Sequence, residues 1–201
     1  MNKLNRSFIY KKIKKTLVKK YGKEKTNLIW NDAGLELKKS LKEYKTISKD
    51  EKMMILPLAA IYNSLRKNNV NDSIDMLIEY GKQTGLRMKK IILRITSIPG
   101  LSKILWKNMP KLMRKTSSPK KGYERRIVSE TNELVGVDIL VCPLYKMAKK
   151  LNVPEIAPVI CAMDKEYMTG FKKIEYTRSK AIGNGDDCCD YRLRYNKGKK
   201  D

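Results

Sequence analysis

The sequence contains no histidine, and this absence removes several common forms of catalysis. Without an imidazole the chain cannot form a Ser-His-Asp or Cys-His nucleophile system, a HExxH zinc site or a histidine pH switch. Any proton transfer must therefore use Asp, Glu, Cys, Tyr or water.

Long apolar runs are also missing. The longest one covers residues 53–61 and is interrupted by Pro57, so it is too short to span a membrane. Residues 1–25 lack the apolar stretch of roughly 7–15 residues that a secretory signal needs. We therefore expect a cytoplasmic protein.

Acidic residues are scarce, with 21 Asp and Glu against 45 Lys and Arg and a formal net charge of +24. Only 10 of the basic residues are Arg, whereas base and phosphate recognition favours the planar fork of that side chain. Aromatic residues make up 7% of the chain and do not alternate with the basic runs as a stacking platform would require. We interpret the charge as a solvated surface and do not expect a nucleic-acid partner.

The charge is concentrated near the N-terminus. Residues 1–25 hold ten Lys and Arg and a single acid, Glu24. Apolar side chains recur between the lysines and predict a basic amphipathic helix over residues 4–21; they are Leu4, Phe8, Ile13, Leu17 and Tyr21. We favour packing of this stripe on the protein, with contact to an anionic membrane surface as the alternative. The segment is interpreted as an arm before a single domain of residues 26–198.

The periodicity of that domain changes near residue 118. Helical spacing predicts helices over residues 26–43, 51–66, 74–81, 85–95 and 101–113. After a loop at 116–122, strands are predicted at 123–129, 137–141, 173–182 and 188–195, with helices at 143–151 and 154–169. We therefore predict an α+β fold, in which a helical part (26–118) packs with a β-β-α-α-β-β part (119–198). The latter forms an antiparallel sheet of about four strands.

All four cysteines lie in the last sixty residues. In a reducing cytoplasm we do not expect disulfides. Cys142 lies where a strand passes into a helix, and the helix dipole there would lower the pKa of its thiol and favour a reactive thiolate. The alternation of the last strand turns Cys189 inward with Tyr191, and Cys188 outward. Cys189 also fits the description of a small core residue.

Asp164 follows Cys161 by three residues, so both side chains lie on one helical face. A carboxylate one turn from a thiol is typical of a general base beside a nucleophile. A competing interpretation is a zinc site formed by Cys142, Cys161 and Cys189 with Asp164, although no CxxC pair supports it. Otherwise we expect no cofactor.

A longer constellation covers the C-terminal part of the chain. It runs Cys142-x-x-Tyr145, Pro154-Glu155, Cys161-x-x-Asp164, Tyr176-Thr-Arg178-Ser179 and Gly183-x-Gly185-Asp-Asp-Cys-Cys189-Asp190-Tyr191. In order and spacing it resembles the L-2-amino-thiazoline-4-carboxylic acid hydrolase family, closely over residues 136–195 and loosely from about residue 28. Members are named for opening the thiazoline ring to N-carbamoyl-cysteine, on the bacterial route to L-cysteine. The resemblance implies a hydrolase with a small-molecule substrate.

On this hypothesis Asp164 deprotonates the attacking water or binds the amidinium, while Cys161 or Cys142 is an alternative nucleophile. Arg178 is the candidate for the substrate carboxylate. The other substrate-binding candidates are Tyr145, Gly185, Cys189 and Asp190.

Amides of residues 183–187 could stabilise the tetrahedral intermediate. These residues also have structural interpretations, such as glycines in a turn and an ion pair between Arg178 and Asp190. Two other functions stay open: a non-catalytic ligand-binding or regulatory module on the same scaffold, and a nucleic-acid or membrane-surface binder acting through residues 1–25.

Overall fold

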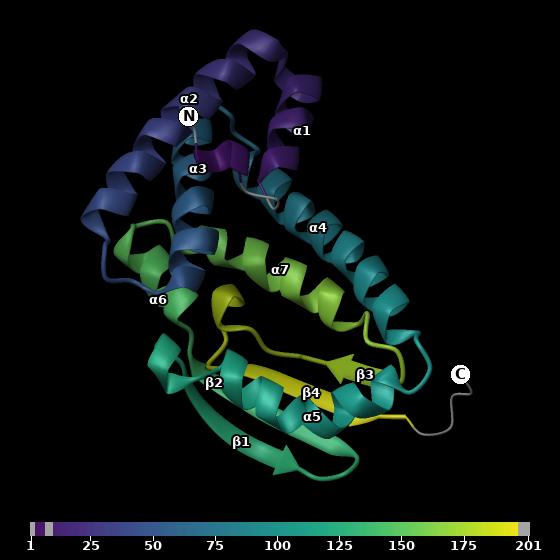
Figure 1. Cartoon of the computed structure of the whole chain (residues 1–201). Helices are drawn as coiled ribbons and strands as arrows, with labels where there is room; N and C mark the ends of the chain where they lie inside the picture. The colour runs from purple at the N-terminus through teal and green to yellow at the C-terminus, as the bar shows by residue number, and fades with distance from the viewer. Residues whose placement is uncertain (1–2, 7–9, 197–201) are drawn as a thin grey trace.

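The computed structural model describes residues 3–6 and 10–196. Helices come first and a sheet follows, which confirms the predicted α+β class (Figure 1). The helices are α1 (Lys11–Tyr21), α2 (Lys23–Glu43), α3 (Leu56–Lys67), α4 (Ser73–Thr96), α5 (Leu101–Thr116), α6 (Pro143–Lys150) and α7 (Ala157–Met168). The strands are β1 (Glu124–Glu130), β2 (Leu134–Val141), β3 (Ile174–Thr177) and β4 (Cys189–Tyr195).

The basic N-terminal segment packs on the domain. Leu4, Ile13 and Leu17 are buried in the same core cluster as Trp30 of α2. The apolar stripe of this segment therefore meets the core. The single helix expected over residues 4–21 is instead a 3-10 turn at Lys3–Arg6 followed by α1, and Phe8 lies outside the described residues.

Helix α4 lies against α7 at a distance that only glycine allows. A Cβ atom at Gly81 would lie 2.3 Å from the carbonyl oxygen of Val159, and one at Gly85 would lie 2.4 Å from that of Met163. Because both sets of contacts advance in the same direction, the two helices run parallel (Figure 1). The predicted break between 81 and 85 is wrong: α4 is continuous, and these glycines mark a close contact in place of a helix end.

The four strands form an antiparallel sheet in the order β1-β2-β4-β3. Its inner face belongs to a second core cluster, together with Trp106, Met109 and Met113 of α5. The sheet residues in that cluster include Val135, Val137, Ile139, Ile174, Tyr176, Cys189 and Leu193. Cys188 was expected to face outward; it is not part of the inner cluster and lies near Asp187 and Asp138, although its side chain is buried.

Strand β3 is shorter than the predicted strand over 173–182, and carboxylates explain where it ends. Asp190 accepts hydrogen bonds from the amides of Ser179 (2.9 Å) and Lys180 (2.6 Å). Asp186 accepts one from the amide of Ala181 at 2.7 Å. These amides are therefore not available to a sheet ladder, and the chain leaves the sheet at Arg178 for a 3-10 turn at Ile182–Asn184.

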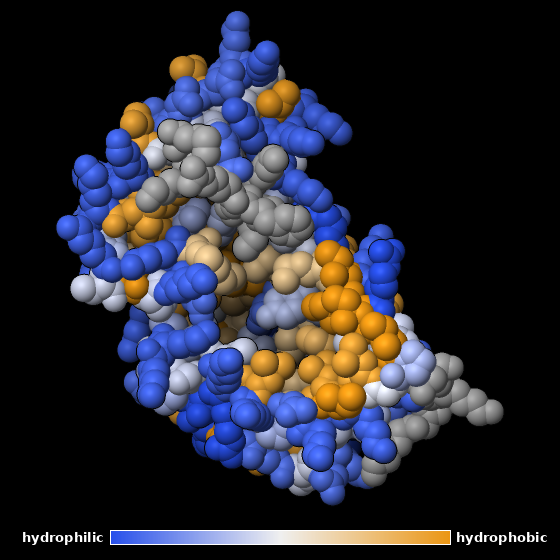
Figure 2. All heavy atoms as spheres, in the orientation of Figure 1, coloured by the Kyte–Doolittle hydropathy of each residue, from blue (hydrophilic) through white to orange (hydrophobic). Residues whose placement is uncertain are grey.

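The surface is mainly hydrophilic on the face that Figure 2 shows, apart from an apolar area over the end of α4 and over α5. A hollow opens near the middle of the same face. None of the helices in the described part of the chain has the length and apolarity needed to cross a bilayer.

The close contact of Gly81 and Gly85 with α7 predicts how alanine at these positions would change the free energy of unfolding. Alanine is intrinsically favoured over glycine in a helix by about 1 kcal/mol, so replacement of an exposed glycine would stabilise α4. At Gly81 and Gly85 the new methyl group would meet backbone carbonyls. We therefore expect Gly81→Ala and Gly85→Ala each to lower the free energy of unfolding by about 1–3 kcal/mol.

Urea unfolding followed by circular dichroism measures this change. Lys82→Ala, at an exposed position of the same helix, is the control and should stay within about 0.5 kcal/mol of wild type. Glycine variants as stable as that control would contradict the close contact.

Candidate functional site

Three side chains from different elements meet beside α7. Asp164 lies on α7, Tyr191 on β4, and Arg178 directly after β3. The hydroxyl of Tyr191 donates a short hydrogen bond to Oδ2 of Asp164. Nη1 of Arg178 lies 3.6 Å from the same oxygen and 3.4 Å from the Tyr191 hydroxyl. The carboxylate is thus held by a phenol and a guanidinium, both anchored on the sheet side.

A cavity of about 300 Å³ opens in front of this carboxylate. Asp164 is the only charged side chain among the residues that line it in the described part of the chain. The lining otherwise consists of apolar, phenolic and hydroxyl side chains: Met109, Leu112, Met113, Thr116, Ser117, Tyr123, Ile139, Tyr167, Met168, Phe171 and Tyr191. The carboxylate gives this pocket a polar side that can accept hydrogen bonds from a ligand.

Tyrosines surround the carboxylate. Asp164 and burial together raise the pKa of Tyr167 well above its usual value. Burial first, and then Asp164, do the same to the pKa of Tyr191. Both phenols therefore stay protonated near neutral pH and can act as hydrogen-bond donors. Tyr176, whose ring lies 5.9 Å from that of Tyr191, has a buried hydroxyl with no hydrogen-bond partner among the described residues.

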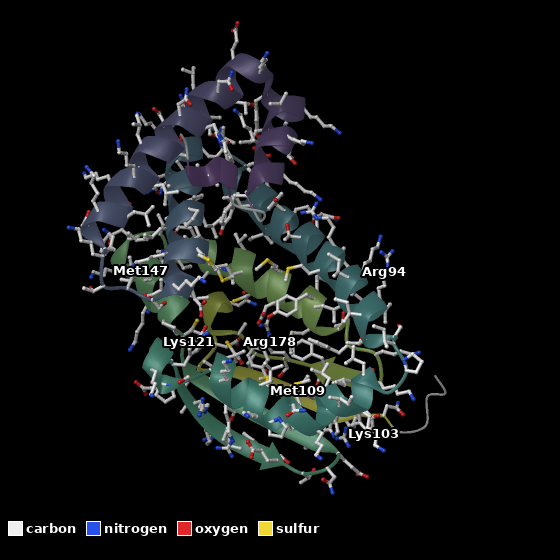
Figure 3. The ribbon with its side chains drawn as sticks, in the orientation of Figure 1. Arg94, Lys103, Met109, Lys121, Met147 and Arg178 are labelled. Carbon is white, nitrogen blue, oxygen red and sulfur yellow. The ribbon has the colours of Figure 1, made fainter. Side chains whose placement is uncertain are left out.

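Arg178 is enclosed and already engaged. Its side chain is 5% exposed, and Nη2 donates to the backbone carbonyl of Cys161 at 2.9 Å. The guanidinium ties β3 to α7 and balances the charge of Asp164. It is not among the residues that line the cavity, so Arg178 contacts Asp164 from the side away from the cavity; its label in Figure 3 lies near the middle of the molecule.

The thiols lie near this site, but their environment does not favour thiolates. Burial raises the pKa of Cys161 to about 12 and that of Cys189 to about 11. Burial also raises the pKa of Cys142, although the backbone amides of Tyr145 and Leu144 act in the opposite direction. The expectation of a lowered pKa at Cys142 is therefore wrong, because desolvation outweighs the helix terminus.

The remaining predicted site residues do not join Asp164 at the cavity. The ring of Tyr145 is covered by the ammonium of Lys149 at 4.6 Å. Gly185 is exposed, with a φ of 99° that suits glycine. Asp190 holds the segment after β3, and Cys189 accepts a hydrogen bond from the amide of Ile182 at 3.3 Å.

Three of the five amides that were expected to stabilise an oxyanion, in the turn at 183–187, already donate hydrogen bonds to backbone carbonyls just before it. The amides of Asn184 and Asp186 donate to the carbonyl of Ala181, and that of Gly185 donates to Ile182. Gly183 packs on α7, where a Cβ would lie 2.7 Å from the Cys161 sulfur. The turn therefore has a structural role beside α7.

The zinc interpretation finds no matching cluster. Within residues 3–6 and 10–196, no three Cys, Asp or Glu side chains are grouped so that they could hold a metal ion. Glu155 of the Pro154-Glu155 motif accepts a hydrogen bond from Tyr62 of α3 at 2.9 Å, which ties the start of α7 to the helical part.

Sequence reasoning singled out Asp164 but not the tyrosines around it. A signal for them was present, because the alternation of the last strand turned Tyr191 inward and Tyr167 follows Asp164 by one helical turn. Eleven of the fifteen aromatic residues are Tyr, so phenols dominate whatever aromatic pocket the chain can form.

The fold and site define an α+β protein with a small cavity beside a carboxylate that is held by Tyr and Arg. The family model of L-2-amino-thiazoline-4-carboxylic acid hydrolase matches residues 51–193, which is more than half of the chain. The chain therefore belongs to this family, and the match includes α7, β3 and β4.

No curated protein matches the chain significantly. Among solved structures, a trafficking protein particle complex subunit 3 from Naegleria fowleri, covalently bound to palmitic acid, is 16% identical. It covers 72% of this chain and 96% of its own, with a TM-score of 0.36. An Fe(II) unliganded H-NOX protein mutant from K. algicida is 13% identical and covers 94% and 96%, with a TM-score of 0.34. At these TM-scores nothing about this chain follows from either likeness.

The enclosed position of Arg178 predicts a structural penalty when it is removed. Arg178→Ala leaves the Cys161 carbonyl and Asp164 without their cation, and we expect the free energy of unfolding to fall by about 2–4 kcal/mol. Chemical denaturation measures the loss. Arg194→Ala, an exposed arginine of β4, is the matched control and should change it by less than about 0.5 kcal/mol. Equal effects of the two variants would contradict the anchoring role.

The raised pKa of Cys161 predicts a dependence of stability on pH. In the unfolded chain the thiol ionises near its ordinary pKa of 9.0, whereas in the folded chain it stays protonated up to about 12. Between these values the unfolded state binds fewer protons, so stability falls as pH rises. The fall should be steeper in wild type than in Cys161→Ala, by up to about 1.4 kcal/mol per pH unit.

Urea unfolding of both proteins at pH 8 and at a pH between 10 and 11 measures this difference. At the higher pH, wild type should have lost more free energy of unfolding than Cys161→Ala, relative to their values at pH 8. Parallel pH profiles for the two proteins would show that the folded protein does not protect this thiol from ionisation.

Proposed function

We propose that this protein is a hydrolase of small cyclic amidines, with a 2-amino-thiazoline carboxylate as the substrate that its family name suggests. One observation carries the proposal: among the described residues, Asp164 is the sole charge lining a cavity of apolar, phenolic and hydroxyl side chains. An amidinium is a planar cation whose N–H groups donate charge-assisted hydrogen bonds to a carboxylate oxygen. The pocket therefore suits the amidine end of such a ring.

In the proposed reaction Asp164 takes a proton from a water molecule, and the water oxygen bonds to the ring carbon between nitrogen and sulfur. This addition places the electron pair of the C=N bond on the ring nitrogen. As the bond from that carbon to sulfur breaks, the hydroxyl proton passes to this nitrogen, and the sulfur leaves as a thiolate that receives the proton held by Asp164. The product is an N-carbamoyl thiol, with water supplying the oxygen and both hydrogens. Tyr191 and Arg178 engage Oδ2 of Asp164, so we assign Oδ1 to the water and the substrate.

The thiols have no covalent role in this proposal. A protonated thiol is a weak nucleophile, and the raised pKa values of Cys142 and Cys161 disfavour the thiolate near neutral pH. Substitution of either residue by Ser should therefore reduce turnover only modestly, through packing. Arg178 is a positioning residue, since it acts through Asp164.

The lining of the pocket predicts that the amidine of the substrate contributes more to turnover than its carboxylate. Because no basic side chain lines it among the described residues, the substrate carboxylate would lie toward the cavity mouth. Removal of the carboxylate from the ligand should then cost less turnover than replacement of the amidine by a neutral ring. A binding module without catalysis is the second candidate, and one observation favours it: Oδ2 of Asp164 is already occupied by a phenol and a guanidinium.

Asp164→Asn tests the proposal directly. The amide can neither accept a proton nor pair with a cation, so we expect ring opening to slow by roughly a hundredfold or more. Release of thiol from the thiazoline carboxylate, followed with a thiol reagent on purified protein, measures the rate. Asp187→Asn, at an exposed aspartate of the turn before β4, should leave the rate unchanged.

Circular dichroism melts of both variants separate loss of chemistry from loss of fold. Wild type that binds the thiazoline by calorimetry and never releases thiol would overturn the hydrolase proposal and assign the cavity to ligand binding. Equal rates in wild type and Asp164→Asn would remove Asp164 from the chemistry.

A further inference from the structure

A long stretch of the chain carries basic residues and no acidic ones. Between Glu79 and Glu124, residues 80–123 contain twelve Lys and Arg and no Asp or Glu. This stretch forms most of α4, the Pro99-Gly100 turn and all of α5. Arg114 and Lys121 pair with Glu130 and Asp50 from outside this stretch, but Arg94, Lys103 and Lys107 form no ion pair with any of the described residues.

The same stretch exposes large aliphatic side chains. Ile95 on α4, Ile98 in the turn and Ile104 on α5 are 50%, 58% and 60% exposed. Ile91 and Leu93 of α4 are also exposed. Soluble proteins seldom leave so many neighbouring aliphatic side chains in water without a use for them.

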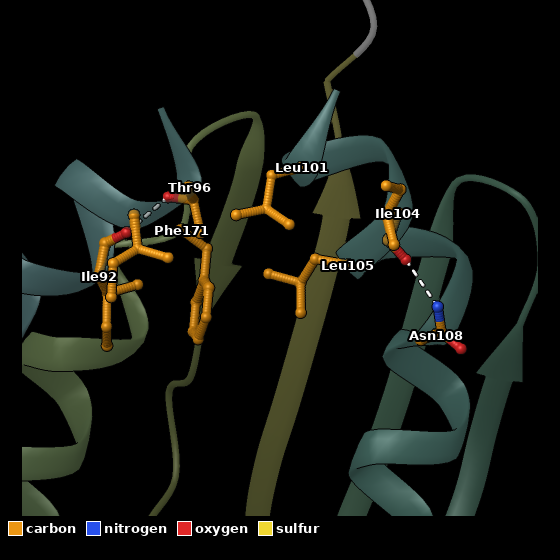
Figure 4. Close-up of a pocket in the computed structure, with 8 residues that line it drawn as sticks. Ile92, Thr96, Leu101, Ile104, Leu105, Asn108 and Phe171 are labelled. Carbon is orange, nitrogen blue, oxygen red and sulfur yellow. Dashed lines mark hydrogen bonds between the residues drawn. The ribbon is translucent and has the colours of Figure 1, made fainter. Parts of the chain in front are cut away.

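Two of them, Ile95 and Ile104, line an apolar hollow of about 370 Å³ between the two helices (Figure 4). Its lining is almost entirely aliphatic and aromatic: Ile92, Ile95, Leu101, Ile104, Leu105 and Phe171, with Thr96 and Asn108 as the polar members. Figure 2 shows the apolar area bounded by hydrophilic residues, and Arg94 and Lys103 lie along its edge (Figure 3). We call this surface the α4–α5 elbow.

We propose that the α4–α5 elbow docks the protein on an anionic lipid bilayer. Exposed isoleucines can enter the boundary between headgroups and acyl chains, while the surrounding lysines and arginines meet the lipid phosphates. Each cation near an anionic membrane surface contributes on the order of 1 kcal/mol. The α4–α5 elbow combines exposed apolar side chains and basic side chains on one face, and this combination is typical of a peripheral membrane contact.

The charge argues against the other occupants of this surface. A second copy of the chain would bring two faces rich in lysine and arginine together, and their charges would repel. Nucleic acid would use the cations but not the isoleucines, because it offers no apolar phase to bury them. The N-terminal segment is a poor membrane contact, since Leu4, Ile13 and Leu17 are already buried.

Vesicle co-sedimentation of the full chain tests the proposal. Wild type should sediment with vesicles of phosphatidylcholine and phosphatidylglycerol and not with phosphatidylcholine alone. Ile98→Asp with Ile104→Asp should weaken this binding roughly tenfold or more, because both exposed side chains would carry a charge that the bilayer rejects. The matched control is Leu28→Asp with Leu35→Asp, which alters two equally exposed leucines on α2.

A second pair of variants tests the charge. Lys103→Glu with Lys107→Glu should also weaken vesicle binding roughly tenfold or more, whereas Lys38→Glu with Lys39→Glu on α2 should change it little. All of these positions are exposed, and thermal melts monitor that each variant stays folded.

Several outcomes would overturn the proposal. Equal binding to neutral and anionic vesicles, or no binding to either, would contradict it. So would elbow variants that lose no more binding than the α2 controls. Sedimentation velocity showing a dimer that dissociates in the isoleucine variant would assign the elbow to a second copy. Loss of vesicle binding in the lysine variant alone would leave only unspecific charge attraction.

Discussion

Gly81 and Gly85 bring the backbone of α4 against the carbonyls of Val159 and Met163, and the position of the site follows from that distance. Asp164 comes directly after Met163. The contact that sets the position of α7 along α4 therefore also sets the position of the Asp164 carboxylate. Gly183 makes a similar close contact on another side of α7, where its lack of a side chain leaves room for the sulfur of Cys161. Three glycines thus determine how α7 lies between α4 and the sheet.

The site that results is a carboxylate with phenols around it. Tyr191 reaches Asp164 from β4 and Arg178 from the end of β3, so sheet and helix must both be in place before the carboxylate has its partners. The buried thiols nearby fill space beside this arrangement, and burial keeps them protonated. In a chain without histidine, this leaves a carboxylate to receive a proton and phenols to donate hydrogen bonds.

Periodicity in the sequence was enough for the class of fold and for the order of the strands along the chain, and it placed Cys161 and Asp164 together on one helix. It failed where the outcome depends on groups far apart in sequence. The glycines of α4 looked like a helix break because their partner, α7, begins more than seventy residues later. Arg178 looked free to bind a ligand because nothing local indicates its bond to the Cys161 carbonyl. The pKa of the Cys142 thiol was predicted to be lowered because its place before a helix can be predicted from the sequence. The burial that raises this pKa depends on the tertiary structure.

The parallel course of α4 and α7 has an electrostatic consequence. Two parallel helices align their macrodipoles, so their negative ends lie side by side and repel. Here both helices end near the loop after α7, where the amide of Lys172 donates to the hydroxyl of Thr96 at 3.0 Å. Arg94 stands in the last turn of α4, and Lys172 and Lys173 follow α7. Some of the excess positive charge of this chain therefore lies beside the negative C-terminal ends of α4 and α7. It offsets the repulsion between two helix ends that the glycine contact holds close to each other.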